Sequence, residues 1–540
     1  MKTILRLLAF TIVFLVSFHT FSQSTPFSIT LEPLDIPELG GIQSYAFAQD
    51  NGKWLIIGGR LDGLHQRQPF AAFDIAGHNN QLLVIDPVSQ KKWSAPLTSL
   101  PTPIQEQLSA TNMEFYQDGD YLYFVGGYGY SATLSDHTTY DKLTAIKVPD
   151  VINAIVNGSG ISTYFRQISH PDFQVTGGRF QKINNTYYLV GGQKFIGRYN
   201  PSGPNSGQGF TQEYTNQIRK FNITDDGTTI TVNHLPSITD AVNLHRRDYN
   251  VTAQIMPNGN EGLTAFSGVF QPTADLPFLN SVNIESSGYT VNNNFTQYYN
   301  HYHCANIPLY SAINNEMHTV FFGGIAQFYD NAGTLVQDNE VPFVKTIARV
   351  TRDASGTMTE YKLPIEMPSL LGTGSEFIPN ETLPLYTNYV IKLDELTNDP
   401  TLVGYIYGGI SSTAENIFLI NDGTQSSATS QIFKVILTKN TALGVDHLNG
   451  QSISNLKLMV YPNPNNGTFK LKYYLHKSSD VHVVLYSLEG KKIEDKIFKN
   501  QPAGEINYET TVQNLPIGGT YILTVKTEFE TATQKIIIKP

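Results

Sequence analysis

A phrase of β-forming residues that ends in small residues recurs six times along the chain, and this repeat constrains the fold more than any other feature. The first copy is Trp54-Leu55-Ile56-Ile57-Gly58-Gly59. The glycines that close the six copies are Gly58, Gly59, Gly126, Gly127, Gly191, Gly192, Gly268, Gly323, Gly324, Gly408 and Gly409. The phrase keeps its form while the segments between copies vary in length, which is unlike a solenoid of fixed period.

Tight-turn residues precede most copies of the phrase, as Asn51-Gly52 and Asp118-Gly119 do. Such residues accept the positive φ angles that two-residue hairpins require, so each unit begins with two antiparallel strands. In the first unit, residues 81–87 and 91–93 supply a third and a fourth strand. Four strands in each of six units predict an all-β fold, a six-bladed β-propeller.

The last unit lacks one strand. It has strand-like residues at 402–408 and 431–438, and a polar segment follows them. Residues 27–34, near the start of the chain, have strand character and belong to no unit of their own. We predict that they complete the last blade, because this pairing removes an exposed sheet edge.

The glycine pair of the first unit, followed by Asp86 and Trp93, resembles the kelch repeat. Only this unit carries the full pattern, so the resemblance implies a kelch-like propeller, which we expect over residues 23–439. At the repeated glycines a side chain would collide with the neighbouring blade, so we interpret them as structural residues.

The two ends of the chain predict export. Residues 1–22 have the order of a secretory signal peptide, with a charged start, an apolar stretch and small residues before the cleavage point. Residues 440–454 are polar and lack apolar alternation, so they predict a linker. Strand-like runs at 457–461, 468–474, 481–487, 521–526 and 533–538, separated by turn residues, predict a small Ig-like β-sandwich over 455–540. The only cysteine, Cys304, leaves no disulfide framework.

The C-terminal segment carries the motif Tyr461-Pro462-Asn463-Pro464, then Gly467, and ends in a strand-like run that reaches Lys539. This pattern resembles the type A sorting domain of the type IX secretion system. The resemblance implies export across the outer membrane of a Bacteroidetes-type bacterium, with the type IX secretion machinery as the partner of residues 455–540. It also implies a secreted or cell-surface location.

Charge and hydropathy exclude several classes of protein. The chain has 36 Lys+Arg and 46 Asp+Glu, a formal net charge of −10, so no basic surface is available to bind nucleic acid. After the leader, no apolar run reaches the length of about 18 residues that a spanning helix needs, so we expect no transmembrane segment in the mature chain. No nucleotide-binding or metal-ligand motif is present, so we expect no cofactor and no metal.

Candidate binding residues lie where the first strands of the units begin. The candidate set is Arg246, Arg247, Asp248, Tyr249, Arg179, Glu376 and His303. An arginine at the mouth of a central channel presents a planar fork to a carboxylate, although a structural Arg–Asp pair between blades explains the same cluster. The long second-to-third-strand connections are rich in aromatic and amide side chains, which suit a sugar or peptide ligand and equally suit loops that pack together.

Three functions remain open at this point. We expect binding of an extracellular glycan or protein ligand through the long-loop face. The resemblance to bacterial kelch propellers that are sialic-acid mutarotases implies a second one, a sugar-acid mutarotase or epimerase-like enzyme at the channel mouth. This resemblance would assign Arg246, Arg247 and Glu376 the roles of carboxylate clamp and proton shuttle. A passive structural module of the cell surface is the third, and no catalytic motif decides between them.

Overall fold

The computed structural model of the chain describes residues 25–66, 71–199, 209–440, 456–487, 491–512, 518–527 and 531–539. The predicted signal peptide 1–22 lies outside these residues, as does the predicted linker apart from Asn440. Two compact units are present. We call Ile29–Thr438 the large unit, and the residues from Lys439 onward belong to what we call the C-terminal unit. None of the helices in the described ranges has the length and hydrophobicity that a membrane span requires.

The described part of the large unit contains six sheets of four or five strands. We number them in chain order, without regard to residues 27–34, which join the sixth sheet. The first strand of each sheet is the one that is named first below. The first sheet consists of β2 (Ala46–Asp50), β3 (Lys53–Ile57), β4 (Gln81–Asp86) and β5 (Lys91–Pro96). The second consists of β6 (Glu114–Asp118), β7 (Tyr121–Val125), β10 (Lys142–Lys147) and β11 (Arg166–Ser169). The third consists of β12 (Arg179–Ile183), β13 (Thr186–Val190), β16 (Gln217–Asp225) and β17 (Ile230–Thr239).

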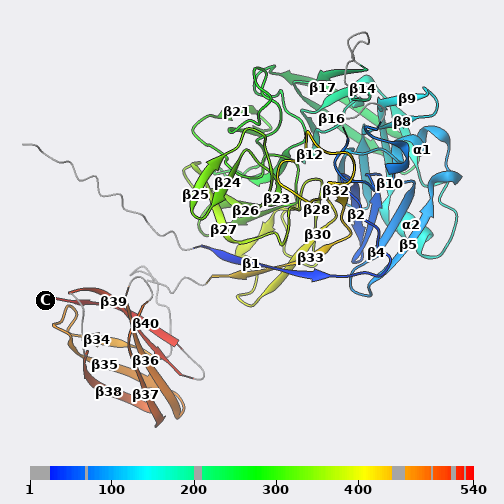
Figure 1. Cartoon of the computed structure of the whole chain (residues 1–540). Helices are drawn as coiled ribbons and strands as arrows, with labels where there is room; N and C mark the ends of the chain where they lie inside the picture. The colour runs from blue at the N-terminus through cyan, green and yellow to red at the C-terminus, as the bar shows by residue number, and fades with distance from the viewer. Residues whose placement is uncertain are drawn as a thin grey trace, which may run out of the picture. The chain divides into compact units, whose positions relative to one another are not determined.

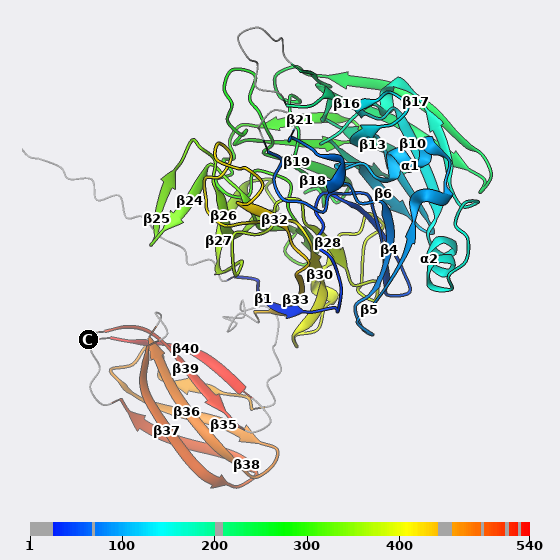
Figure 2. The same cartoon turned by 45° about the vertical axis from the view of Figure 1, so that its right-hand side comes forward.

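The remaining three sheets also begin with an antiparallel pair of strands. The fourth consists of β18 (Asn250–Ile255), β19 (Glu261–Phe266), β20 (Ser281–Glu285) and β21 (Gly288–Asn292). The fifth consists of β22 (Asn306–Ser311), β23 (Glu316–Ile325), β26 (Phe343–Arg352), β27 (Met358–Glu366) and the short β29 (Ile391–Lys392). The sixth consists of β28 (Glu376–Pro379), β30 (Thr401–Tyr407), β33 (Ile432–Lys439) and β1 (Phe27–Leu34). Figures 1 and 2 show these sheets following one another around the large unit in chain order.

The strand β1 comes from the beginning of the chain and pairs with β33, from the end of the large unit. Residues 27–34 are thus the fourth strand of the sixth sheet, and they cover the edge that β33 would otherwise expose.

Main-chain hydrogen bonds from the repeated phrases join neighbouring sheets. In five of the six phrases, the N–H of the second glycine donates to a carbonyl that precedes the first strand of the next sheet. These bonds are Gly59 to Ala110, Gly127 to Val175, Gly192 to Arg246, Gly324 to Leu371 and Gly409 to Ile42, each 2.8 or 2.9 Å long. The last one runs from the sixth sheet to the residues before the first.

Close approach explains why glycine occupies these positions. Gly126 has a φ of 64°, and a Cβ atom there would lie 2.0 Å from the carbonyl oxygen of Val175. A non-glycine residue would therefore meet the main chain of the next sheet in addition to the strain of left-handed backbone.

The hydrophobic core lies between neighbouring sheets. One cluster joins Leu55 and Ile57 of the first sheet to Leu122 and Phe124 of the second. Another joins the first and sixth sheets, where the ring of Trp54 packs 4.9 Å from that of Tyr405. Each sheet thus buries its faces against the sheets before and after it.

The long connections of the large unit carry structure of their own. Four contain two-stranded sheets: β8 (Tyr128–Ser131) with β9 (Asp136–Thr139), β14 (Gln193–Gly197) with β15 (Phe210–Tyr214), β24 (Phe328–Asn331) with β25 (Thr334–Gln337), and β31 (Ile410–Ser412) with β32 (Ser426–Ala428). The helices are α1 (Thr102–Leu108), α2 (Val148–Val156) and the 3-10 turns η1 (Ile75–Gly77), η2 (Leu97–Ser99), η3 (Pro171–Phe173) and η4 (Leu393–Glu395). The protein is accordingly all-β.

The described residues of the C-terminal unit form two sheets. One contains β34 (Met459–Tyr461), β35 (Thr468–Leu475) and β38 (Gly504–Thr511). The other contains β36 (Ser479–Ser487), β37 (Lys492–Gln501), β39 (Gly519–Lys526) and β40 (Thr531–Ile538). Alternate residues such as Phe469, Leu471, Val483 and Leu523 are buried in one core between the sheets.

Candidate functional site

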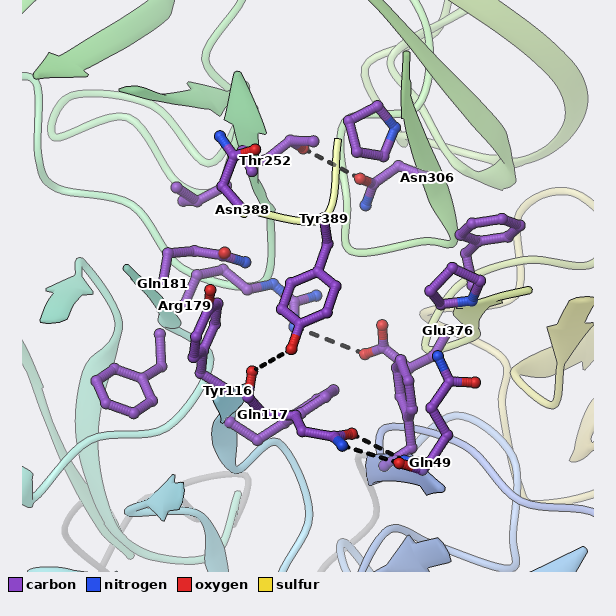
Figure 3. Close-up of a pocket in the computed structure, with 18 residues that line it drawn as sticks. Gln49, Tyr116, Gln117, Arg179, Gln181, Thr252, Asn306, Glu376, Asn388 and Tyr389 are labelled. Carbon is purple, nitrogen blue, oxygen red and sulfur yellow. Dashed lines mark hydrogen bonds and ion pairs between the residues drawn. The ribbon is translucent and has the colours of Figure 1, made fainter. Parts of the chain in front are cut away.

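The first strands of all six main sheets line one cavity, which we call the turn-side cavity because it lies near their hairpin turns. Its walls include Gln49 of β2, Gln117 of β6, Gln181 of β12, Thr252 of β18, Asn306 of β22 and Glu376 of β28 (Figure 3). Its volume is about 190 Å³. We call the line that runs through this cavity, past the six first strands, the axis.

A segment of the sixth sheet enters this cavity. The connection between β28 and β30 spans residues 380–400, where the other main sheets have short turns. It carries Tyr389, whose hydroxyl donates to the carbonyl of Gln117 at 2.9 Å (Figure 3). It also carries Asn388, whose Nδ2 donates to the carbonyl of Gln254 at 3.2 Å. The segment thereby attaches the sixth sheet to the second and fourth across the turn-side end of the axis.

A constriction lined by Arg179, Glu376 and His303 lies next along the axis. Its free volume is about 10 Å³. Nε2 of His303 lies 2.7 Å from Oε1 of Glu376, and Nη1 of Arg179 lies 3.6 Å from the same oxygen. Nε of Arg179 donates to the carbonyl of Tyr249 at 2.9 Å, which holds the guanidinium in place.

Burial and charge set the ionisation of this group. Burial alone would raise the pKa of Glu376, but His303 and Arg179 outweigh it and lower that pKa. Burial, together with the nearby Arg179, lowers the pKa of His303. The surroundings thus favour the charged form of Glu376, whereas burial disfavours the charged form of His303.

A second buried carboxyl group, Glu114, lies beside the constriction. Its side chain accepts the main-chain N–H of Gly178 at 2.7 Å, and the residue is 1% exposed. Burial raises the pKa of Glu114 to about 8.

The largest of these spaces, which we call the loop-side cavity, opens on the other side of the constriction and has a volume of about 530 Å³. It shares Asp248 and His303 with the constriction. Aromatic side chains form much of its wall: Phe73, Tyr128, Phe195, Tyr199, Phe210, Phe270 and Tyr302. Several of them belong to the small hairpins β8–β9 and β14–β15.

The two arginines of the loop-side cavity are each paired with an acidic side chain. Arg247 forms an ion pair with Asp248, and its Nε donates to the hydroxyl of Tyr214 at 3.0 Å. Its guanidinium carbon lies 5.2 Å from the centre of the Phe270 ring. Arg60 donates from Nε to Oδ1 of Asp62 at 2.7 Å. Both arginine charges in the cavity are therefore balanced, and Asp275 adds a further carboxyl group to its wall.

Arg246 lies apart from the other candidates. It is 0% exposed and lines none of these cavities. Its Nη1 donates to the carbonyls of Ser267 at 2.6 Å and Asn280 at 3.0 Å, and its guanidinium stacks 4.0 Å above the ring of Phe278. Burial lowers the pKa of Arg246 to about 9. These contacts assign Arg246 to the interior of the fourth sheet.

Tyr249 is also buried, and its hydroxyl donates to the carbonyl of Val190 at 3.0 Å. It contacts only the constriction among the three spaces. The remaining candidates, Arg179, Arg247, Asp248, His303 and Glu376, all line the axis.

Sequence reasoning missed a positional signal for cavity residues. The residue that follows the glycine pair lines the loop-side cavity in five of the six repeats: Arg60, Tyr128, Gln193, Ile325 and Ile410. Arg60 could thus have been found by asking which side chain each repeat presents directly after its second glycine. In the described part of the chain, neither cavity contains three His, Cys, Asp or Glu side chains placed to hold a metal ion.

Comparison with known proteins identifies the C-terminal unit. Residues 459–539 match the family model described as "Secretion system C-terminal sorting domain". The resemblance drawn from Tyr461-Pro462-Asn463-Pro464 and the strands around it is therefore confirmed, and the domain is a type IX sorting domain. This domain indicates a secreted or cell-surface protein.

The large unit has less informative relatives. No curated protein matches the chain in sequence. Among solved structures, the "Structure of YjhT" has 11% identity and a TM-score of 0.41, covering 76% of this chain and 99% of that one. A glycoside hydrolase family 43 arabinoxylan arabinofuranohydrolase from Bacillus subtilis has 12% identity and a TM-score of 0.27, covering 93% of each chain. Scores this low carry no argument about fold or function.

Proposed function

We propose that the large unit is a six-bladed kelch-like β-propeller that binds an extracellular glycan in the loop-side cavity, after export by the type IX secretion system. The proposal includes a signal peptide at 1–22, a propeller over 23–439, a linker at 440–454, an Ig-like fold for residues 455–540 and a Bacteroidetes-type source. The observation that best supports a six-bladed propeller is the lining of the turn-side cavity, because one strand from each of the six main sheets lines it.

The order of the sheets supports a ring. The glycine hydrogen bonds link consecutive sheets, and one of them connects the sixth sheet to the residues before the first. Among the described residues, the fourth phrase is the one of the six without such a glycine hydrogen bond to the next sheet. There, Nδ2 of Asn250 in the fourth sheet donates to the carbonyl of Tyr302, which precedes the fifth sheet, at 3.0 Å. Pairing of β1 with β33 supplies the fourth strand of the sixth blade.

The chemistry of the loop-side cavity supports a glycan as its ligand. A volume of about 530 Å³ falls in the range of about 300–1,000 Å³ that is common for small-molecule sites. Aromatic rings offer flat apolar faces to the C–H face of a sugar, and the Arg–Asp pairs offer donors and acceptors to its hydroxyls. Because Arg247 and Arg60 are already neutralised by Asp248 and Asp62, a neutral sugar fits this cavity better than a free carboxylate.

A sugar mutarotase or epimerase is the second candidate. The observation that favours it is the contact between His303 and Glu376 at the base of the loop-side cavity, where the imidazole and the carboxyl group lie 2.7 Å apart. Such a pair can pass a proton to and from a sugar oxygen. Glu376 and His303 would then act on the ring, with Arg247 holding the ligand. Arg246 takes no part in this version, because its guanidinium donates to main-chain carbonyls.

The binding proposal is tested with a glycan array probed with the full chain, followed by titration of any ligand found. Phe210→Ala removes a ring that lines the loop-side cavity, and Phe328→Ala removes a ring from the β24–β25 hairpin, which does not line it. We expect Phe210→Ala to weaken binding by about 2- to 10-fold, the effect of losing one aromatic contact, and Phe328→Ala to leave it unchanged. Equal affinity in both variants would place the site elsewhere.

The enzyme candidate has a separate test. Exchange between the anomers of a free sugar that binds is followed by NMR, with Glu376→Gln and His303→Gln as the variants. An exchange rate equal to that in buffer would exclude the mutarotase or epimerase activity and would leave the binding proposal intact. A rate enhancement that both variants abolish while binding persists would establish it.

A further inference from the structure

A cluster of metal-ligating side chains lies outside the two axial cavities. It consists of His170, Asp172 and His234, and it is the one such group of three in the described part of the chain. His170 follows β11 of the second sheet, Asp172 lies in η3, and His234 lies on β17 of the third sheet. The cluster therefore bridges the outer strands of two neighbouring sheets.

The three side chains converge on a small volume. Oδ2 of Asp172 lies 3.0 Å from Nδ1 of His234 and 3.5 Å from Nδ1 of His170. The two imidazole rings stack with their centres 3.9 Å apart. One ligand atom from each residue fits within 4.8 Å of the others, so a single ion can touch all three.

Buried neighbours hold this group in position. The ring of Phe173, which is 0% exposed, packs 5.7 Å from His170 and 5.6 Å from His234. The buried Arg219 donates from Nη1 to the main-chain carbonyl of Asp172. The N–H of His170 donates to the carbonyl of Asp141 at 3.0 Å. A metal ion would thus meet ligands on a fixed turn and a strand, rather than on a free loop.

We propose that His170, Asp172 and His234 form a binding site for a divalent transition-metal ion, for which Zn²⁺ is the probe. Two imidazole nitrogens and one carboxylate oxygen are a ligand set that zinc, nickel and copper accept and that calcium and magnesium, which prefer oxygen, do not. The three side chains are between 30% and 43% exposed, so an ion can enter and water can complete its coordination.

The ion would have one hydrogen bond to replace. Nδ1 of His170 accepts the N–H of Asp172 at 3.2 Å, which is long for this kind of bond. Binding at this nitrogen exchanges a weak hydrogen bond for a metal–nitrogen bond, and binding at the other ring nitrogen leaves it in place. In either case the ion would join the second and third sheets at their outer edges, and it would stabilise the folded chain by mass action.

The test is titration of the full chain, without an affinity tag and stripped with a chelator, with ZnCl₂ in a calorimeter. We expect one tight equivalent of zinc and a higher Tm in its presence. Asp172→Asn keeps the shape of the side chain and the main-chain contact of Arg219, and His234→Gln removes one imidazole. Each should weaken zinc binding by at least about tenfold and abolish the rise in Tm.

A matched control is His245→Gln, because His245 is also a stacked imidazole, 3.7 Å from the ring of Tyr214, and lies outside the cluster. It should keep the zinc affinity and the rise in Tm. Copper added in place of zinc should give an electron paramagnetic resonance spectrum with hyperfine coupling from two nitrogens, which His234→Gln reduces to one. Absence of zinc binding, unchanged binding in Asp172→Asn and His234→Gln, or equal competition by CaCl₂ would overturn the proposal.

Discussion

Replacing Gly126 by alanine tests whether the glycine pairs hold neighbouring sheets together. Gly126 and Gly119 lie at opposite ends of β7, and both have left-handed backbone, with φ of 64° and 58°. A Cβ atom at Gly119 meets nothing within 4 Å, whereas one at Gly126 would lie 2.0 Å from the carbonyl oxygen of Val175. The two alanine variants therefore share the backbone strain and differ in the contact with the next sheet.

The structure gives the size of the difference. Left-handed backbone costs alanine about 1–2 kcal/mol, and the restriction of the unfolded chain offsets about 0.4–1 kcal/mol of this, so Gly119→Ala should lose about 1 kcal/mol. Gly126→Ala has the same loss and must also displace the Val175 carbonyl, which accepts the N–H of Gly127 at 2.9 Å. Overpacking adds about 1–3 kcal/mol and the weakened hydrogen bond about 1 kcal/mol, for a total of about 3–5 kcal/mol.

Urea unfolding followed by tryptophan fluorescence measures both variants. The two tryptophans of the chain, Trp54 and Trp93, belong to the first sheet, so the signal reports the large unit alone. We expect the midpoint for Gly126→Ala to fall well below that for Gly119→Ala, at similar slopes. Equal midpoints would show that the close approach to Val175 contributes nothing, and the role assigned to the glycine pairs would be refuted.

Four further outcomes are expected. Because burial raises the pKa of Glu114 from 4.5 to about 8, its contribution to stability is present below pH 4.5 and is lost as the pH rises through 8, so Glu114→Gln should flatten the fall in Tm between pH 5 and 9. Tyr389→Phe should cost about 1 kcal/mol in urea unfolding, since it removes the hydrogen bond to Gln117, and should leave glycan binding unchanged. Those amide protons of residues 28–34 that face β33 should exchange slowly, and fast exchange of all of them would contradict the pairing of β1 with β33. In a host with type IX secretion, a chain without residues 455–540 should remain inside the outer membrane on cell fractionation, whereas export of that chain would contradict the role of the sorting domain.

Local signals in the sequence account for the strands that were predicted. Tight turns such as Asn51-Gly52 mark the hairpins, and the segments expected at 81–87 and 91–93 form β4 and β5. The helices α1 and α2 were not predicted, although each has a proline in its first turn, which is a helix-start signal. The strands β37 and β38 were also missed, because their charged, solvent-facing residues obscure the alternation of apolar ones.

The candidate site was predictable only in part, because side-chain direction depends on register. Arg246 and Arg247 are adjacent, yet one donates to carbonyls inside the fourth sheet and the other lines the loop-side cavity. A period of two residues separates the faces of a strand, so a sequence pattern without register cannot say which arginine faces inward. The course of residues 380–400 toward the second and fourth sheets is a tertiary contact that no local pattern encodes.

The constriction at Arg179, Glu376 and His303 separates the loop-side cavity from the turn-side cavity. A gap of about 10 Å³ is far too narrow for a pyranose ring, and Tyr389 stands on its far side. A polysaccharide bound in the loop-side cavity, as proposed, could not pass through this constriction to the turn-side cavity. On the proposal that this cavity binds a glycan, the ligand must enter and leave from the loop side.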